Sequence, residues 1–264
     1  MEKHMEFERV ADIKRLNFII EVLRARLPKG AEVLDVGCGN GVISRSLGEN
    51  GFNVRGIDVS DKAIAKARSL NTLPNVRFEV VSAEQLVAEG SRYYAVICSE
   101  VLEHLEDPGG LLQVLNQSLH PEGILVVTVP NGKGPRESLV TRPYIHLQQK
   151  SDWRWKLMLK LKGLFGYKGT TVQSDAENLT HIQFFTKSSL EQLAFAHQFK
   201  IVRFGKTNFI EDVFPFSFIT KKIKALQKWD CALAELLPYH MTGGFVTVWE
   251  KSGQARNFVK NENI

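Results

Sequence analysis

Apolar residues along the first half of the chain recur with two different periods. Between residues 5 and 27 they fall three and four positions apart, which is typical of an amphipathic helix, and Pro28 and Gly30 end it. Short apolar runs typical of buried strands follow at residues 32–36, 54–58, 76–81, 95–98 and 124–129. Helical patterns separate several of them, at residues 40–49, 61–70 and 111–119. This alternation predicts an α/β fold, a doubly wound parallel sheet with helices on both faces.

The alternation stops after residue 130 and resumes at residue 181. The resumed part predicts a helix from 186 or 187 to 198, a strand at 200–205, helical structure at 218–237 and a last strand at 244–250. We therefore expect residues 1–130 and 181–250 to form one core. Residues 131–180 are expected to be an inserted lid, and residues 251–264 a flexible tail. Residues 121–123 are expected to form a turn before the fifth strand.

The first predicted strand runs into a glycine-rich turn. Glycines at 37, 39 and 41 give the pattern G-x-G-x-G, with Val42 where the third glycine of the dinucleotide-binding pattern G-x-G-x-x-G stands. Such a turn lets a ligand lie against bare backbone. Asp35 precedes the first glycine by two residues, and its carboxylate would repel a pyrophosphate but suit a cationic or amine-bearing ligand. The spacing and Asp35 therefore favour a ligand other than a nicotinamide dinucleotide.

An acidic residue, Asp58, ends the second predicted strand. It lies about 20 residues beyond the glycine turn, where a carboxylate accepts hydrogen bonds from ribose hydroxyls. Asp58 therefore indicates a ribose-containing ligand without distinguishing one cofactor from another.

Several motifs taken together resemble those of class I S-adenosylmethionine-dependent methyltransferases. They lie at residues 35–41, 56–58, 82–84, 99–108, 121–123 and 181–186. Within that class the chain most resembles the small-molecule group that includes the ubiquinone-biosynthesis O-methyltransferases. The resemblance covers residues 30–130 well and residues 181–205 moderately, and it hardly extends to the insertion.

The resemblance implies a Rossmann-like sheet of seven strands with the last strand antiparallel, and S-adenosylmethionine as the cofactor. Cofactor contacts are expected from Asp35, Gly37, Gly39, Asp58, Val59, Ser82, Ala83, Glu84 and Ser99. By motif position the first three would hold the methionine end, Asp58 the ribose, residues 82–84 the adenine, and Ser99 the wall near the sulfonium. Ser82 stands where the family often has Asp. Because serine is a weaker acceptor, the contact to the adenine amine is expected from Glu84 or from backbone.

Two histidines are candidates for a general base. His181 opens the segment that in relatives returns to the site, and His146 within the insertion is the second candidate. The alternative for His181 is a hydrogen bond at a helix start. Glu100, Glu103 and His104 are spaced i, i+3 and i+4, which can bind a divalent metal, as is thought of some relatives. The alternative is a structural turn, and we expect no metal.

Composition and charge exclude several classes of protein. With 264 residues, 44% of them hydrophobic, the chain is neither disordered nor a disulfide scaffold. No apolar run reaches the length of a membrane span, and three widely separated cysteines suit a reduced cytoplasm, where we expect the protein. The net charge of +5 is too small to indicate nucleic acid by itself.

The basic residues concentrate in the insertion. Residues 150–168 hold six basic residues and one acid, together with Trp153 and Trp155. The alternation at residues 153–162 predicts a strand, whereas its Leu, Lys and Met content favours a helix. Such a segment suits an anionic membrane surface or an acidic substrate, and the alternative is a solvated lid. A second basic stretch at residues 221–228 lies beside Trp229.

The sequence predicts methyl transfer from S-adenosylmethionine to a small-molecule or lipid-linked acceptor, at a hydroxyl. The stretch Ser99-Glu100-Val101 lacks the Asn/Asp-Pro-Pro-aromatic pattern of enzymes that methylate nucleobase amines, so no DNA is expected. The alternatives are a non-catalytic S-adenosylmethionine-binding interaction module and an RNA or protein methyltransferase. A nicotinamide oxidoreductase would require the other glycine spacing.

Overall fold

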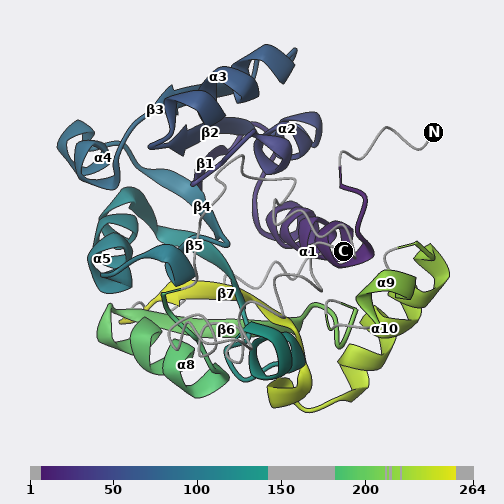
Figure 1. The fold of residues 1–264 in the computed structure, drawn as a ribbon. Coiled ribbons are helices and arrows are strands. Elements are labelled where there is room, and N and C mark those ends of the chain that lie inside the picture. Colours follow the sequence, from purple (N-terminus) through teal and green to yellow (C-terminus); the bar gives the residue numbers. More distant parts are fainter. Residues whose placement is uncertain (1–6, 142–181, 212, 214–215, 221, 254–264) are drawn as a thin grey trace, which may run out of the picture.

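A single seven-stranded sheet, in the order β3-β2-β1-β4-β5-β7-β6, organises the molecule (Figure 1). The structure is a computed structural model that describes residues 7–141, 182–211, 213, 216–220 and 222–253. The strands are β1 (Glu32–Val36), β2 (Asn53–Asp58), β3 (Val76–Val80), β4 (Tyr93–Ser99), β5 (Leu119–Pro130), β6 (Phe199–Lys206) and β7 (Gly244–Lys251).

The first five strands run parallel, and β7 runs antiparallel to both of its neighbours, β5 and β6. The predicted Rossmann-like sheet with an antiparallel last strand is therefore confirmed. In parallel sheets of this kind, ligands bind outside the carboxyl ends of the strands, where the strand order reverses. Here the order reverses between β1 and β4, so a ligand site is expected at the loops that follow β1, β2 and β4.

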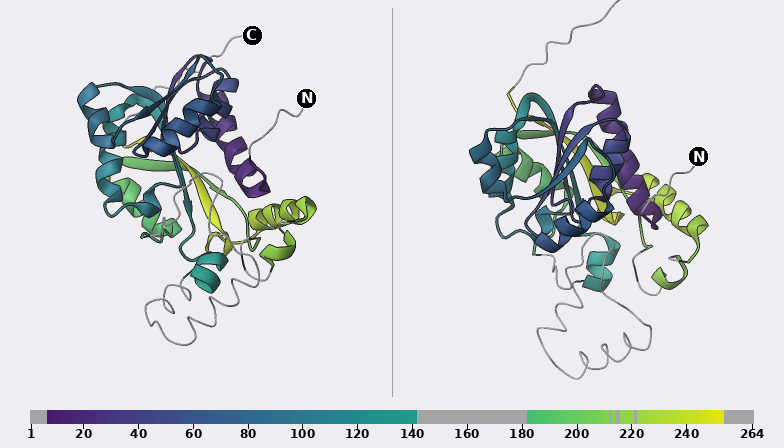
Figure 2. Two further views of the ribbon diagram at one scale, coloured as in Figure 1. Left: turned by 45° about the horizontal axis from the view of Figure 1, so that its top comes forward. Right: turned by 90° about the horizontal axis from the view of Figure 1, so that it is seen from above.

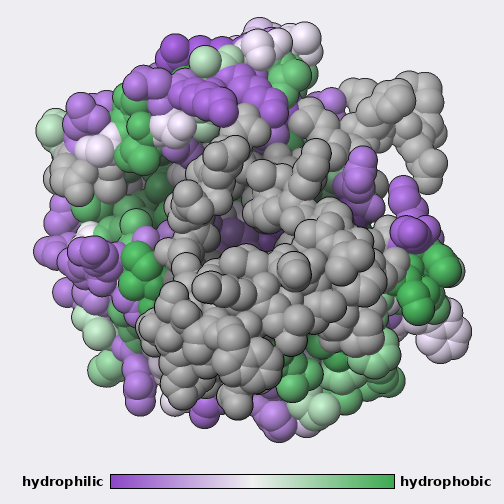
Figure 3. All heavy atoms as spheres, viewed as in Figure 1, coloured by the Kyte–Doolittle hydropathy of each residue, from purple (hydrophilic) through white to green (hydrophobic). Residues whose placement is uncertain are grey.

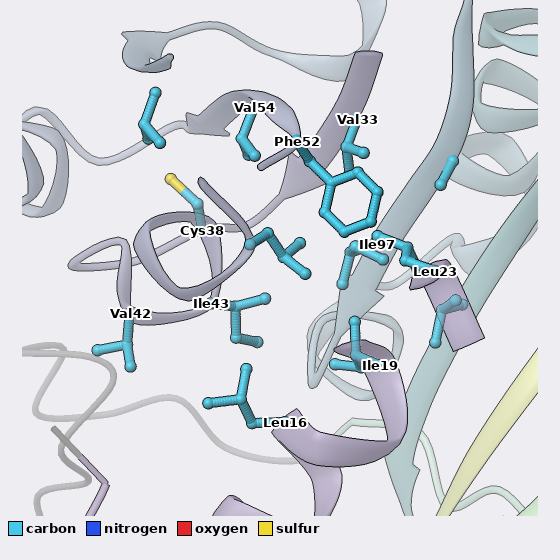
Figure 4. Packing of buried hydrophobic residues seen from close by; sticks show 14 of the residues in the cluster. Leu16, Ile19, Leu23, Val33, Cys38, Val42, Ile43, Phe52, Val54 and Ile97 are labelled. Atoms are coloured by element: carbon cyan, nitrogen blue, oxygen red, sulfur yellow. The ribbon is translucent and has the colours of Figure 1, made fainter. Parts of the chain in front are cut away.

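Helices cover both faces of the sheet (Figure 2). They are α1 (Val10–Arg26), α2 (Val42–Glu49), α3 (Asp61–Leu70), α4 (Ala83–Glu89), α5 (Pro108–Ser118), α8 (Lys187–Ala196), α9 (Ser217–Thr220) and α10 (Lys224–Leu236), with shorter turns η1 (Leu102–His104), η2 (Glu137–Thr141) and η3 (Tyr239–Met241). Apolar side chains of α1, α2 and α3 form one core with the sheet, part of which is drawn in Figure 4. Those of α4, α5 and α8 form the second core on the opposite face.

Several boundaries differ from the sequence prediction. Helix α1 begins at Val10 rather than near residue 5. The predicted turn at residues 121–123 lies inside β5, where the pairing with β4 shifts register between Tyr93 and Ala95. The helix α4 was not predicted, because its one buried apolar anchor among the described side chains, Leu86, gives no periodic pattern.

The helix predicted at residues 218–237 is divided into α9 and α10. Ile223 between them has an extended backbone, with φ −123° and ψ 97°. The Nε2 of Gln227 donates to the carbonyl of Thr220 at 3.0 Å, which satisfies an acceptor that the break leaves without a helical partner. This hydrogen bond lowers the free-energy cost of the break, because it gives one carbonyl at the end of α9 a partner.

The two ends of the expected lid are joined on the core. The N–H of Gly132 donates to the carbonyl of Phe185 at 2.6 Å, and a Cβ on Gly132 would lie only 2.5 Å from the carbonyl carbon of Phe184. The Nδ2 of Asn131 donates to the carbonyls of Tyr239 and Thr242 at 2.8 and 2.7 Å. The first residues of this segment therefore pack as part of the core, and most of the rest, residues 142–181, lies outside the described residues.

Replacing Leu23 by Ala is expected to destabilise the protein, because Leu23 of α1 is fully buried in the first core. Deleting a buried leucine side chain costs about 2–5 kcal/mol. The free energy of unfolding, measured in urea, is expected to fall by that amount. Leu236→Ala is the matched control, since Leu236 is 84% exposed and its loss is expected to change stability by less than about 0.5 kcal/mol. Equal effects of the two variants would contradict the packing of α1 described here.

Candidate functional site at the carboxyl ends of β1, β2 and β4

The turn after β1 exposes backbone at the edge of the sheet. Gly37 and Gly39 have φ values of +67° and +54°, in the left-handed region that favours glycine. A Cβ on Gly37 would lie 2.5 Å from a methyl group of Val101, which follows β4. Gly41, with φ +81°, then begins α2. The turn is therefore specified by conformation and by close approach, and it leaves a bare cradle for a ligand.

Asp35 lies beneath this turn, with its side chain almost completely buried. Its Oδ2 accepts a hydrogen bond of 2.6 Å from the hydroxyl of Ser44 on α2. Burial raises the pKa of Asp35 to about 7, the Ser44 hydrogen bond opposes this rise, and the nearby charge of Asp58 adds to it. Asp35 therefore holds a carboxylate that gains from a cationic neighbour.

Asp58, at the end of β2, ties that strand to the glycine turn. Its Oδ2 accepts from the N–H of Gly39 at 3.0 Å, and its Oδ1 accepts from the N–H of Ser60 at 2.9 Å. Val59 beside it is 76% exposed, an apolar side chain presented to solvent. The structure thus brings together Asp35, Gly39 and Asp58, as the sequence predicts.

The residues expected at the adenine begin the helix α4. Ser82 and Gln85 cap this helix reciprocally: the N–H of Ser82 donates to Gln85 Oε1 at 2.8 Å, and the N–H of Gln85 donates to Ser82 Oγ at 3.4 Å. The backbone N–H of Val81 donates to the carbonyl of Asp58 at 3.3 Å, which places this segment beside the end of β2. The side chains of Ala83 and Glu84 lie outside the described part of the structure.

A chain of hydrogen bonds closes the end of β4. The hydroxyls of Ser99 and Thr128 lie 2.9 Å apart, and that of Thr128 also donates to Glu100 Oε1 at 3.0 Å. Glu100 has a φ of +57°, unusual for a residue other than glycine. Its Oε1 also lies 3.0 Å from the guanidinium of Arg15 on α1. Helix α1 is thereby tied to the strand end that carries Ser99.

Sequence reasoning missed Arg15 and Thr128 as parts of this edge. The available signal was a charged side chain on the core-facing side of α1, between the buried residues Ala11 and Ile19 at spacings of four. A buried arginine at such a position is almost always paired.

Glu103 lies near Glu100, in the turn that follows β4. Its side chain is buried, and neither carboxylate oxygen accepts a hydrogen bond within the described residues. Burial, together with the charge of Glu100, raises the pKa of Glu103 well above its usual range. In the part of the chain that the structure describes, no group of three His, Cys, Asp or Glu side chains is arranged to hold a metal ion.

Neither histidine proposed as a base, His181 or His146, lies within the described residues. The residue after His181 is Ile182, whose N–H donates to the carbonyl of Glu103 at 2.8 Å. Gln183 donates to the same carbonyl at 3.0 Å. The chain therefore leaves the insertion directly against the turn that follows β4.

Comparison with known proteins identifies the family. The family model described as "Methyltransferase domain" matches residues 3–203, more than half of the chain. A ubiquinone biosynthesis O-methyltransferase from Nitrosomonas europaea is 39% identical over 117 residues, 42% of this chain and 49% of the relative. One from Neisseria meningitidis serogroup C is 30% identical over 164 residues, 60% of this chain and 66% of the relative. The matches thus span about half to two thirds of these relatives.

Solved structures share the fold at low sequence identity. The magnesium protoporphyrin IX methyltransferase from Synechocystis PCC 6803 has a TM-score of 0.55 and 18% identity, over 92% of this chain and 84% of its own. An S-adenosylmethionine-dependent methyltransferase from Methanosarcina mazei has a TM-score of 0.55 and 20% identity, over 88% and 97%. The chain belongs to the methyltransferase-domain family and has the fold of class I S-adenosylmethionine-dependent methyltransferases.

Proposed function

We propose that this protein transfers a methyl group from S-adenosylmethionine to a hydroxyl of a small-molecule or lipid-linked acceptor. The observation that carries the proposal is the pair of carboxylates, Asp35 and Asp58, held on either side of the glycine turn. Membership of the methyltransferase-domain family supports it.

The charge of the site fits S-adenosylmethionine better than it fits a dinucleotide. A pyrophosphate on the turn would meet the carboxyl of Asp35, whose ionised form the charge of Asp58 already disfavours by repulsion. The amino and sulfonium groups of S-adenosylmethionine are cations, and they would relieve that repulsion. Asp58 is proposed to accept hydrogen bonds from the ribose hydroxyls, and the side chain of Val59, which is exposed, is proposed to offer an apolar surface beside them. These contacts, with residues 82–84 at the adenine, make up the proposed cofactor site.

Methyl transfer requires little of the protein beyond holding the acceptor and the methyl donor in the right orientation. Bound S-adenosylmethionine would supply an activated methyl group. An acceptor oxygen would bond to the methyl carbon as the carbon–sulfur bond breaks, and the acceptor hydroxyl would lose its proton. Ser99 is proposed to line the wall near the sulfonium, where Thr128 and the Arg15–Glu100 pair fix it. Orienting the two reactants can contribute about 7–11 kcal/mol, and a general base typically adds about 10²–10⁴-fold.

The acceptor side is proposed to be formed by residues 131–180. The relatives' name, ubiquinone biosynthesis O-methyltransferase, supports an aromatic hydroxyl as the acceptor group. We propose His181 as the base, because Ile182 next to it is bonded to the turn after β4, with His146 as the second candidate. The basic residues and tryptophans of 150–168 are proposed to contact an anionic membrane or acidic substrate.

Replacing Asp58 by Ala is expected to weaken S-adenosylmethionine binding about 10- to 100-fold, the loss typical of one hydrogen-bonded charged partner. Isothermal titration measures the change. Asp61→Ala is the matched control, an exposed carboxylate three residues away in the first turn of α3, and it is expected to bind like the wild type. Full affinity in Asp58→Ala would refute the assignment of the ribose site.

Cofactor affinity is expected to rise with pH through about 7. The raised pKa of Asp35 means that the ligand-free protein holds a proton there near pH 6, which a bound cation displaces. Affinity at pH 6 is then about five- to tenfold lower than at pH 8 if the ligand lowers the pKa of Asp35 by one unit or more. Titrations in buffers of different ionisation enthalpy count the released protons.

The variant Asp35→Asn is the control for this effect. It is expected to bind more weakly at pH 8 and to lose the pH dependence between 6 and 8. The ligand-free wild type is expected to lose stability between about pH 4 and pH 7, because the unfolded chain ionises this carboxyl while the folded protein keeps it protonated. The variant is expected to lack this loss. An unchanged pH dependence in this variant would place the titrating group elsewhere.

His181→Ala is expected to lower kcat about 10²–10⁴-fold on a phenolic quinone precursor and to leave S-adenosylmethionine affinity unchanged. His146→Ala, assayed in parallel, is expected to have the smaller effect. Normal turnover in His181→Ala would remove it as the base. Cofactor binding by the wild type without turnover on any quinone precursor, lipid-linked sugar, RNA or protein would instead support a non-catalytic binding module.

A further inference from the structure

Helix α10 buries two polar and two small side chains and exposes its large apolar ones. Its buried residues include Gln227 and Asp230, whose side chains bond to backbone of neighbouring segments. Large apolar residues on the opposite side are exposed: Leu226, Trp229, Leu233 and Leu236. Trp229 and Leu236 are 76% and 84% exposed. An ordinary surface helix has the reverse arrangement, because its apolar stripe packs on the core.

The segment before α10 extends this apolar face. Phe216, Ile219 and Ile223, in and beside α9, are exposed as well. We call the seven residues the α9–α10 surface: Phe216, Ile219, Ile223, Leu226, Trp229, Leu233 and Leu236. Figure 3 shows hydrophobic side chains gathered in this region, at the right-hand edge of the view, beside hydrophilic ones. Scattered exposed apolar residues are normal in soluble proteins, but a contiguous group marks an interaction site.

The charges around the α9–α10 surface have one sign. The stretch from residue 216 to 229 contains four lysines and no acidic residue. Lys222, Lys224 and Lys228 among them are exposed. The next two acids along the chain are engaged elsewhere: Asp230 accepts from the N–H groups of Phe209 and Ile210, and Glu235 lies 2.6 Å from Lys14. The apolar face is therefore bordered by lysines without acids among them.

We propose that the α9–α10 surface binds an anionic lipid surface, with Trp229 and its apolar neighbours entering the interface and the lysines meeting the headgroups. A basic amphipathic segment with exposed Trp, Phe and Leu has the composition of helices that lie in the plane of a membrane. Trp is favoured at the membrane–water boundary, and each lysine near an anionic leaflet adds attraction. Among the described residues, no helix is long and apolar enough to cross a bilayer.

This surface is connected to the candidate site through α1. Gln227 Oε1 accepts from the N–H of Val10, and Lys14 Nζ donates to the carbonyl of Cys231 at 3.2 Å. Arg15, the next residue of α1, reaches Glu100 after β4. Both views of Figure 2 show α1 beside α10. Membrane contact here would bring the edge that holds Ser99 toward acceptors carried in the bilayer, although lipid binding itself requires no catalysis.

Co-sedimentation of the full chain with vesicles tests the proposal. The wild type is expected to bind phosphatidylcholine vesicles that contain phosphatidylglycerol and not vesicles of phosphatidylcholine alone. Trp229→Ala/Leu236→Ser is expected to lose more than about tenfold in affinity, because both side chains leave the interface. Lys224→Glu/Lys228→Glu is expected to lose about fivefold or more for each lysine, and added salt is expected to weaken wild-type binding.

Phe195→Ser is the matched control, because Phe195 on α8 is 79% exposed and lies outside the α9–α10 surface. It is expected to bind vesicles like the wild type, and circular dichroism should show all variants folded. Unchanged vesicle binding by Trp229→Ala/Leu236→Ser would overturn the proposal and place the lipid contact elsewhere, such as residues 150–168. A wild-type dimer in light scattering that this double variant abolishes, without vesicle binding, would assign the surface to a second copy.

Discussion

The hydrogen bond from the Gly39 N–H to the Asp58 carboxylate, 3.0 Å long, joins the two strand ends on which the candidate site depends. Neighbouring parallel strands place their carboxyl ends at one edge, but nothing in that arrangement alone fixes the loops between strand and helix. Left-handed glycines let the backbone turn back toward Asp58, and Asp35 is buried below by the same turn. The site thus holds two carboxylates, those of Asp35 and Asp58, near enough to repel each other, and a bound cation would relieve this repulsion.

A second link fixes the opposite wall. Arg15 reaches from α1 to Glu100, and Thr128 joins Glu100 to Ser99. Arg15 pairs with Asp12 on its own helix at 2.8 Å and with Glu100 at 3.0 Å, and the second pair couples the packing of α1 to the position of the β4 edge. The first two turns of α1 are also hydrogen-bonded to α10. One helix therefore connects the core, the candidate site and the lysine-bordered apolar surface.

The pattern of apolar residues predicted the strands, which depend on local sequence. It missed the features that depend on contacts between residues far apart in the chain. Every strand of the described sheet was found, because the buried strands read as apolar runs. Asp35 and Asp58 were predicted as cofactor contacts because they lie at recognisable spacings from the glycine turn. The partner of Glu100 was not predicted, since Arg15 lies 85 positions away, and no local rule pairs them. The break at Ile223 was missed because the Gln227–Thr220 hydrogen bond that tolerates it is visible only in three dimensions.

The central claim is that the carboxylate-flanked glycine turn selects a cationic sulfonium cofactor over an anionic dinucleotide. Isothermal titration of the wild-type protein with S-adenosylmethionine, with its demethylated product and with NADH tests this directly. The account predicts binding of the first two in the micromolar range, near −8 kcal/mol, and none of NADH. Binding of NADH without S-adenosylmethionine would contradict it, because the charge of Asp35 beneath the glycine turn would then not govern the choice of ligand.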